Sequence, residues 1–176
     1  MQEAFGGGDP GGIMARTSES YLTGKAGESQ TWDYLRGAGF VRPSAEQRAN
    51  IAAAFERHGL TINKSGFDVV SAEHADALGS VEQLAARIDR LKLYEVKTCG
   101  ADRKAEVSAG FKGLGFTLTR KERDNADALG ARYRFLFVNL RTGAHRECSL
   151  TDFFIEGQAR IYETWSVFLT QDLPAE

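Results

Sequence analysis

The segment Phe116–Leu140, which reads FTLTRKERDNADALGARYRFLFVNL, decides the class of fold. Thr119 and Glu122 have the spacing of a capping box, so a helix is expected to begin after Thr119 and to end near Gly130. The stretch that follows, YRFLFVNL at residues 133–140, is apolar at successive positions, as in a strand that is covered on both faces. A helix that leads into such a strand predicts an α/β domain with a central mixed β-sheet flanked by α-helices.

An earlier stretch, LKLYEVKTCG at residues 91–100, is also expected to be a strand, although it carries an acid and a base within an apolar run. Because alternate side chains of a strand share a face, Glu95 and Lys97 point the same way. Burying either charge alone is costly, so an ion pair at a strand end is the simplest structural explanation. The acid-x-lysine spacing alone therefore does not identify a catalytic site.

A further acid lies in a third expected strand. The stretch LTINKSGFDVV at residues 60–70 predicts a hairpin around the turn-forming residues 63–66, with Phe67–Val70 as its second strand. Asp68 falls inside that strand, where aspartate is disfavoured and finds no obvious local partner. An acid in this setting indicates a ligand-binding role.

Together, Asp68 and Glu95 have the chemistry of a metal site. Two carboxylates at neighbouring strand ends suit a hard divalent cation such as Mg²⁺, which prefers oxygen ligands and retains waters for a substrate phosphate. Lys97 would then orient or deprotonate an attacking water, or neutralise charge that develops on a phosphate oxygen.

Three helices are expected before the strand that contains Glu95, at Ser18–Gly37, Ser44–Gly59 and Ser80–Arg90. On the first of these, the acid Glu28 shares a side with residues that should pack, namely Thr31, Trp32 and Leu35. Glu28 is therefore a third candidate acid for the site. The alternative is that it lies at the edge of the apolar stripe and is solvated.

A length of 176 residues suits one domain, which we expect at residues 16–176 after a flexible glycine-rich tail at residues 1–15. Within the domain, residues 160–170 are expected to form a strand rather than a helix. No apolar run is long enough to span a membrane, no signal-peptide pattern is present, and two cysteines, Cys99 and Cys148, are too few for a disulfide framework. A cytoplasmic protein without membrane contact is expected.

The formal net charge of -2 lacks the basic excess of a protein that coats nucleic acid without selectivity, so any such contact must be local. Lys112, Arg120 and Lys121 are candidate contacts to DNA phosphates, because Gly113 and Gly115 allow a backbone to approach closely. Solvated surface charge is the simpler account of each lysine or arginine taken singly.

Four motifs, taken in order, resemble the PD-(D/E)XK nuclease superfamily, whose pattern is a helix with a glutamate, an aspartate in a strand, an acid-x-lysine in the next strand, a helix and a further strand. The matching segments are GKAGESQTWDYLRGAGF with Glu28, SGFDVV with Asp68, LYEVKTCG with Glu95 and Lys97, and Phe116–Leu140. The resemblance spans residues 20–140.

Two departures accompany the resemblance. The proline that often precedes the aspartate is replaced by Phe67, which does not take part in the chemistry. The inserted helix also lengthens the interval between Asp68 and Glu95, so Asp76 and Asp89 remain alternatives to Asp68 as the partner acid. Asp68 is preferred for its strand context.

The resemblance implies a restriction-endonuclease-like core and a Mg²⁺-dependent DNA endonuclease of a restriction system, with Mn²⁺ able to substitute. Asp68, Glu95 and the backbone carbonyl of Val96 would bind the metal, Lys97 would position the water, and Glu28 would support the metal ligands. The alternatives are a repair or junction nuclease of the same fold, and a nuclease-like module that only binds DNA or protein. Cutting of both strands by a homodimer is compatible with the sequence, which leaves the oligomeric state open.

Overall fold

The structure, a computed structural model, describes residues 29–99, 111, 114 and 116–154. Residues 29–37 are helical, as expected for the end of the first helix. The elements that follow, with η marking 3-10 helices, are β1 (Phe40–Val41), α2 (Ala45–Glu56), β2 (Val69–Ser71), η1 (Ala72–Ala77), α3 (Val81–Ala85), β3 (Leu93–Cys99), α4 (Arg120–Leu129), η2 (Gly130–Arg132), β4 (Tyr133–Asn139), β5 (Ala144–Cys148) and η3 (Leu150–Phe154).

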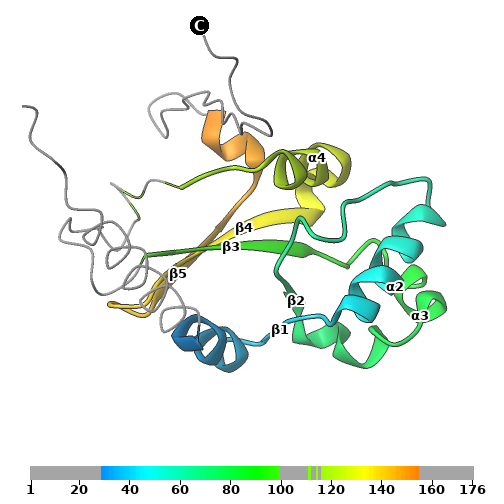
Figure 1. The fold of residues 1–176 in the computed structure, drawn as a ribbon, viewed down its shortest axis with the longest axis horizontal. Helices are drawn as coiled ribbons and strands as arrows, with labels where there is room; N and C mark the ends of the chain where they lie inside the picture. Colours follow the sequence, from blue (N-terminus) through cyan, green and yellow to red (C-terminus); the bar gives the residue numbers. More distant parts are fainter. Residues whose placement is uncertain (1–28, 100–110, 112–113, 115, 155–176) are drawn as a thin grey trace, which may run out of the picture.

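The five strands form one mixed sheet in the order β1-β2-β3-β4-β5 (Figure 1). β2 is antiparallel to β1 and to β3. β4 is parallel to β3 and antiparallel to β5. The parallel strands pair along their whole length, from Leu93 opposite Tyr133 to Cys99 opposite Asn139, and α4 lies between them in the chain. The α/β class and the mixed sheet flanked by helices are therefore confirmed.

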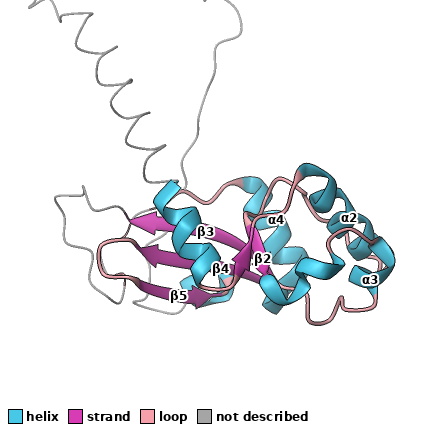
Figure 2. Ribbon diagram, turned by 90° about the horizontal axis from the view of Figure 1, so that it is seen from below, coloured by secondary structure: helices cyan, strands magenta, loops and turns pink. Residues whose placement is uncertain are grey.

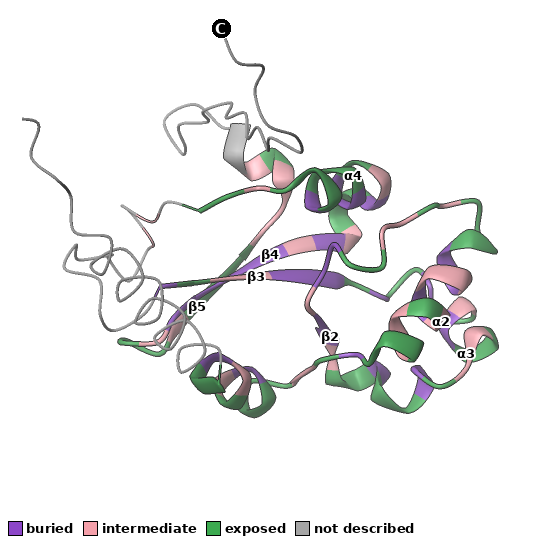
Figure 3. Cartoon of the chain, in the orientation of Figure 1, coloured by how far each residue is buried: buried purple, intermediate pink, exposed green. Residues whose placement is uncertain are grey.

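β4 is apolar at successive positions because its side chains enter two separate cores. Phe135 packs on the face covered by α4, whereas Leu136 and Val138 pack with Leu35 of the helix at residues 29–37 on the other face. Figures 1 and 2 show α4 and that helix on opposite sides of the sheet. In Figure 3, buried positions concentrate along β3 and β4, which form the centre of the molecule.

Both predicted capping boxes form. At the start of α2, Ser44 Oγ accepts from the backbone N–H of Gln47 at 3.2 Å, and Gln47 Oε1 accepts from the backbone N–H of Ser44 at 2.9 Å. The equivalent pair at the start of α4, Thr119 and Glu122, is part of the candidate site. Capping boxes depend on four consecutive residues, which is why the sequence predicts them well.

The hairpin predicted for residues 60–70 is wrong. Its turn forms, with the Gly66 N–H donating to Asn63 O at 3.0 Å, but the residues between α2 and the turn are not a strand, and β2 begins at Val69. β2 pairs with β1 and β3 instead. The side chain of Ile62 packs against the core that α4 covers, so its apolar character reflects burial of a connecting segment.

Other differences concern short elements. The helix predicted at Ser80–Arg90 is regular only in α3, and turns follow it. β1, η1 and β5 were not predicted, since two to six residues carry little periodic signal. The expected tail at residues 1–15 and strand at residues 160–170 lie outside the described residues.

No helix in the described ranges is both long and apolar enough to cross a membrane.

Candidate active site

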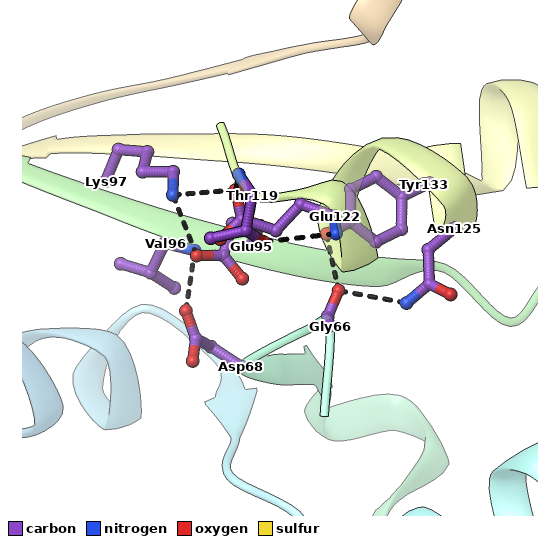
Figure 4. Close-up of polar contacts among 9 residues, drawn as sticks. All are labelled: Gly66, Asp68, Glu95, Val96, Lys97, Thr119, Glu122, Asn125 and Tyr133. Carbon is purple, nitrogen blue, oxygen red and sulfur yellow. Dashed lines mark hydrogen bonds and ion pairs between the residues drawn. The ribbon is translucent and has the colours of Figure 1, made fainter. Parts of the chain in front are cut away.

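Asp68 immediately precedes β2 and is held against the middle of β3 by two hydrogen bonds. Its backbone N–H donates to Tyr94 O at 2.8 Å, and its Oδ2 accepts from the backbone N–H of Val96 at 3.0 Å. These two partners flank Glu95 in the chain. Two acids that are distant in sequence are therefore brought together on neighbouring strands (Figure 4).

Lys97 lies between two carboxylates. Its Nζ is 3.0 Å from Glu95 Oε1 and 3.0 Å from Glu122 Oε2. All three side chains are largely buried, with exposed fractions of 13% for Lys97, 12% for Glu95 and 8% for Glu122. The ion pair expected from the acid-x-lysine spacing is present, and a second acid, from α4, completes it.

Glu122 has two roles, because it also caps α4. Its Oε2, the oxygen that binds Lys97, accepts from the backbone N–H of Thr119 at 3.0 Å, while Thr119 Oγ1 accepts from the Glu122 N–H at 3.3 Å (Figure 4). Sequence reasoning identified the cap but not the contact to Lys97. A helix that connects two parallel strands runs back along them, so its first turn lies near the end of the first strand. The strand–helix–strand order of the sequence could therefore have placed Glu122 near Lys97.

The charges of the site shift its pKa values. Burial raises the pKa of Glu95 to about 8, the negative charge of Asp68 adds to the rise, and Lys97 opposes it. For Lys97, burial alone would lower the pKa, but the attraction of Glu95 and Glu122 outweighs it and the pKa is raised. Lys97 therefore stays protonated between Glu95 and Glu122. The repulsion of Glu95 by Asp68 and Glu122 is what a further cation would relieve.

The chain around Asp68 is fixed from α2. The Arg48 guanidinium donates to the carbonyl oxygens of Phe67 and Asp68, the latter at 3.0 Å. Hydrogen bonds to charged donors are stronger than neutral ones, so Arg48 anchors the backbone at the point where Asp68 projects.

The turn before Asp68 is fixed from α4 and β4. Asn125, which is 1% exposed, donates from Nδ2 to Asn63 O at 2.9 Å and to Gly66 O at 3.0 Å. The Tyr133 hydroxyl donates to the same Gly66 oxygen at 2.5 Å (Figure 4). Burial, together with the nearby carboxylates, raises the pKa of Tyr133, which keeps its hydroxyl a donor. Sequence reasoning found neither residue, since both act through long-range contacts.

The two alternative acids lie elsewhere. Asp76, in η1, is exposed and accepts two hydrogen bonds from Arg87, at 2.8 and 2.9 Å. Asp89 is exposed in the turns that follow α3. The position beside Glu95 is occupied by Asp68.

Of the remaining predicted residues, the structure describes Arg120 and Lys121. Glu28 and Lys112 lie outside the described residues. Arg120 is exposed at the start of α4, and its Nε lies 3.8 Å from Oδ2 of Asp124, one helical turn away, in a surface ion pair. Lys121 Nζ donates to Ser65 Oγ at 3.1 Å, so it contacts the turn that precedes Asp68.

The donor set suits Mg²⁺ only in part. Across the described ranges, no group of three or more His, Cys, Asp or Glu side chains is arranged to hold a metal ion. Mg²⁺, however, is commonly held by one or two carboxylates together with waters and substrate phosphates, and Asp68 and Glu95 supply such a pair. Val96, whose carbonyl was predicted to be a ligand, donates its N–H to Asp68 and so orders one of these acids.

No protein-family model, curated protein or solved structure matches the chain.

Proposed function

We propose that the protein is a Mg²⁺-dependent DNA endonuclease of the PD-(D/E)XK type that acts as a restriction enzyme. The observation that carries the proposal is the position of Asp68 against β3, the strand that holds Glu95 and Lys97. The order of the elements also supports it, since an acid-bearing segment, an acid-x-lysine strand, α4 and the parallel strand β4 follow one another as in that superfamily's pattern.

In this proposal Asp68, Glu95 and the carbonyl of Val96 would hold the metal ion, and Glu28 would support these ligands, as the resemblance to the superfamily implies. Mg²⁺, or Mn²⁺ in its place, would supply Lewis-acid stabilisation of negative charge on the phosphate oxygens. The chain provides two neighbouring acids whose mutual repulsion a cation would relieve, and Arg48 fixes the backbone at Asp68.

Lys97 acts as a donor in this scheme. Its raised pKa keeps the ammonium protonated, so it orients a water or a phosphate oxygen rather than removing a proton. Lys97 Nζ lies 3.0 Å from Glu122 Oε2, so Glu122 would still hold the ammonium if Glu95 were engaged by a metal ion. Glu122 is thus a positioning residue for Lys97.

A cleavage assay on supercoiled plasmid tests the proposal. We expect nicked and linear products with Mg²⁺ and none in EDTA, and a loss of activity of at least about a hundredfold in Asp68→Asn, Glu95→Gln and Lys97→Gln. Asp76→Asn is the matched control, because Asp76 is an exposed aspartate outside the site, and it should retain full activity. Inactivity of the wild type on every DNA substrate, or equal damage by Asp76→Asn, would show that the proposal is wrong.

The choice of substrate separates the nuclease roles. Discrete fragments from long linear DNA indicate a restriction enzyme, whereas cleavage confined to four-way junctions or mismatches indicates repair. Cutting of both strands at one site, with a mass in solution twice that of the chain, indicates that the enzyme acts as a homodimer.

A second candidate is a non-catalytic module that binds DNA or protein. The observation that favours it is the closed arrangement of Lys97, whose ammonium already contacts two carboxylates and which could serve stability alone. This candidate predicts that DNA or protein binding persists in Asp68→Asn and Glu95→Gln while no variant or wild type cleaves DNA.

A further inference from the structure

A cavity of about 460 Å³ opens beside Asp68 and has a basic lining. Three of its lining residues are cations, Arg42, Arg48 and Lys64, and among the residues that the structure describes Asp68 is the one acid in the lining. Such a concentration of positive charge contrasts with the chain as a whole, whose formal net charge is -2. The cavity therefore has the local electrostatic character of an anion site.

The three cations differ in how they are held. Arg48 donates hydrogen bonds to the backbone carbonyl oxygens of Phe67 and Asp68, so its side chain is a fixed part of the cavity lining. Arg42 is exposed and stacks on Trp32, with its guanidinium carbon 4.3 Å from the ring centroid. Stacking of this kind fixes the plane of a guanidinium group.

Lys64 is the most available of the three. It is exposed on the turn before Asp68, and its ammonium forms no hydrogen bond or ion pair with any residue in the described ranges. Next to it, Ser65 also lines the cavity and accepts a hydrogen bond from Lys121 Nζ at 3.1 Å. A fourth cation, which the sequence singled out as a DNA contact, thus stands at the edge of the cavity.

The guanidinium groups of Arg42 and Arg48 are close enough to affect one another. Both side chains line the cavity, and each bears a positive charge that acts on the other. An anion placed near both groups relieves their repulsion. Phosphate is the anion that Arg and Lys side chains bind most readily in nucleic-acid complexes.

Asp68 belongs both to this cavity and to the acid cluster, so the two sites adjoin. We propose that the cavity lined by Arg42, Arg48 and Lys64 binds a backbone phosphate of the DNA strand, next to the phosphate that is cleaved at Asp68 and Glu95. The position of the cleaved phosphate rests on the proposed function, whereas binding of the strand in the cavity does not. Arg42 and Lys64 contact the phosphate, and Arg48 fixes the backbone that lines the cavity.

Binding in EDTA tests this inference without turnover. A fluorescein-labelled DNA duplex is titrated with wild type, Lys64→Gln and the double variant Arg42→Gln/Lys64→Gln over a range of KCl concentrations. Arg146→Gln is the matched control, since Arg146 is an exposed cation on β5, at the opposite edge of the sheet from β1. Circular dichroism checks that each variant is folded.

We expect the double variant to bind the duplex roughly tenfold more weakly near 0.1 M KCl, with the slope of log K against log salt reduced by about two. Lys64→Gln, which removes no packing, should reduce the slope by about one. Arg146→Gln should match the wild type, and inorganic phosphate should compete only at millimolar concentrations.

Unchanged affinity and slope in Lys64→Gln and the double variant would overturn the inference even if the wild type cleaves DNA. An equal loss of duplex affinity in Arg146→Gln would also overturn it. So would tight binding of inorganic phosphate combined with no higher affinity for the DNA duplex. Preference for an RNA duplex over DNA would overturn the assignment to DNA. Conversely, losses confined to Arg42 and Lys64 variants support the inference even if no cleavage is ever observed.

Discussion

Replacement of Gly66 by alanine should disturb both the stability of the fold and the candidate site, because Gly66 is where the turn before Asp68 meets α4. A Cβ at this position would lie 2.8 Å from Lys121 O and 2.8 Å from Asn125 Nδ2. The first of these atoms is helix backbone and cannot rotate away. The turn or α4 must therefore move by several tenths of an ångström.

The cost can be estimated from these contacts. Overpacking of a tight interior typically costs about 1–3 kcal/mol. The Gly66 oxygen also accepts from Asn125 and from Tyr133, and weakening such bonds costs roughly a further 1 kcal/mol each. We expect Gly66→Ala to lower the free energy of unfolding by about 3–5 kcal/mol.

Urea unfolding followed by circular dichroism measures this change. Gly79→Ala is the control, because no atom lies within 4 Å of a Cβ there and its φ is not in the left-handed region. That variant should be neutral or more stable by about 0.4–1 kcal/mol, since alanine restricts the unfolded chain. If the two variants differ by less than about 0.5 kcal/mol, the close approach of α4 to Gly66 is not a feature of the protein in solution.

Three further predictions concern charge and exposure. The pKa of Glu95 is raised to about 8, so the wild type loses, as pH rises from 5 to 8, the stability that depends on the protonated Glu95. In EDTA, Glu95→Gln should therefore gain about 2–4 kcal/mol of stability relative to wild type over this range, and parallel pH profiles from urea unfolding would contradict this. Millimolar Mg²⁺ should raise the Tm of the wild type by a few degrees and leave that of Asp68→Asn unchanged, as scanning fluorimetry would show, and equal shifts would remove Asp68 from the metal site. The pKa of the partly buried Cys148 is raised to about 12 by desolvation and by Asp152, so its thiol should react with iodoacetamide at pH 8 roughly a hundred- to a thousandfold more slowly than in urea. Rapid labelling of the native protein, measured by mass spectrometry, would contradict this protection.

The parts of the fold that short-range patterns encode could be predicted from the sequence. The capping boxes at Ser44 and Thr119 depend on residues three apart, and both form. The apolar run of β4 indicated a strand with two covered faces, which is what the two cores require. Strand alternation likewise put Glu95 and Lys97 on one face, where they form an ion pair.

Long-range contacts account for what the sequence could not predict. The turn at residues 63–66 has turn chemistry, but its partner is Asn125 of α4 rather than a neighbouring strand, so the hairpin prediction failed. Glu122 was assigned only to its cap because its second contact spans 25 positions of the chain. Neither contact leaves a periodic signal in the residues around it, and the Glu122 contact could be inferred only from the strand–helix–strand order, which places the start of α4 near the end of β3.

The shared oxygen of Glu122 has a practical consequence. A main-chain amide, that of Thr119, and the Lys97 ammonium bind the same Oε2, so any event that shifts the lysine changes the field at that amide. The Thr119 amide resonance of the 15N-enriched protein therefore reports on the site without any substitution in it. Its chemical shift, followed by nuclear magnetic resonance during addition of metal or DNA, would register occupancy of the site separately from cleavage.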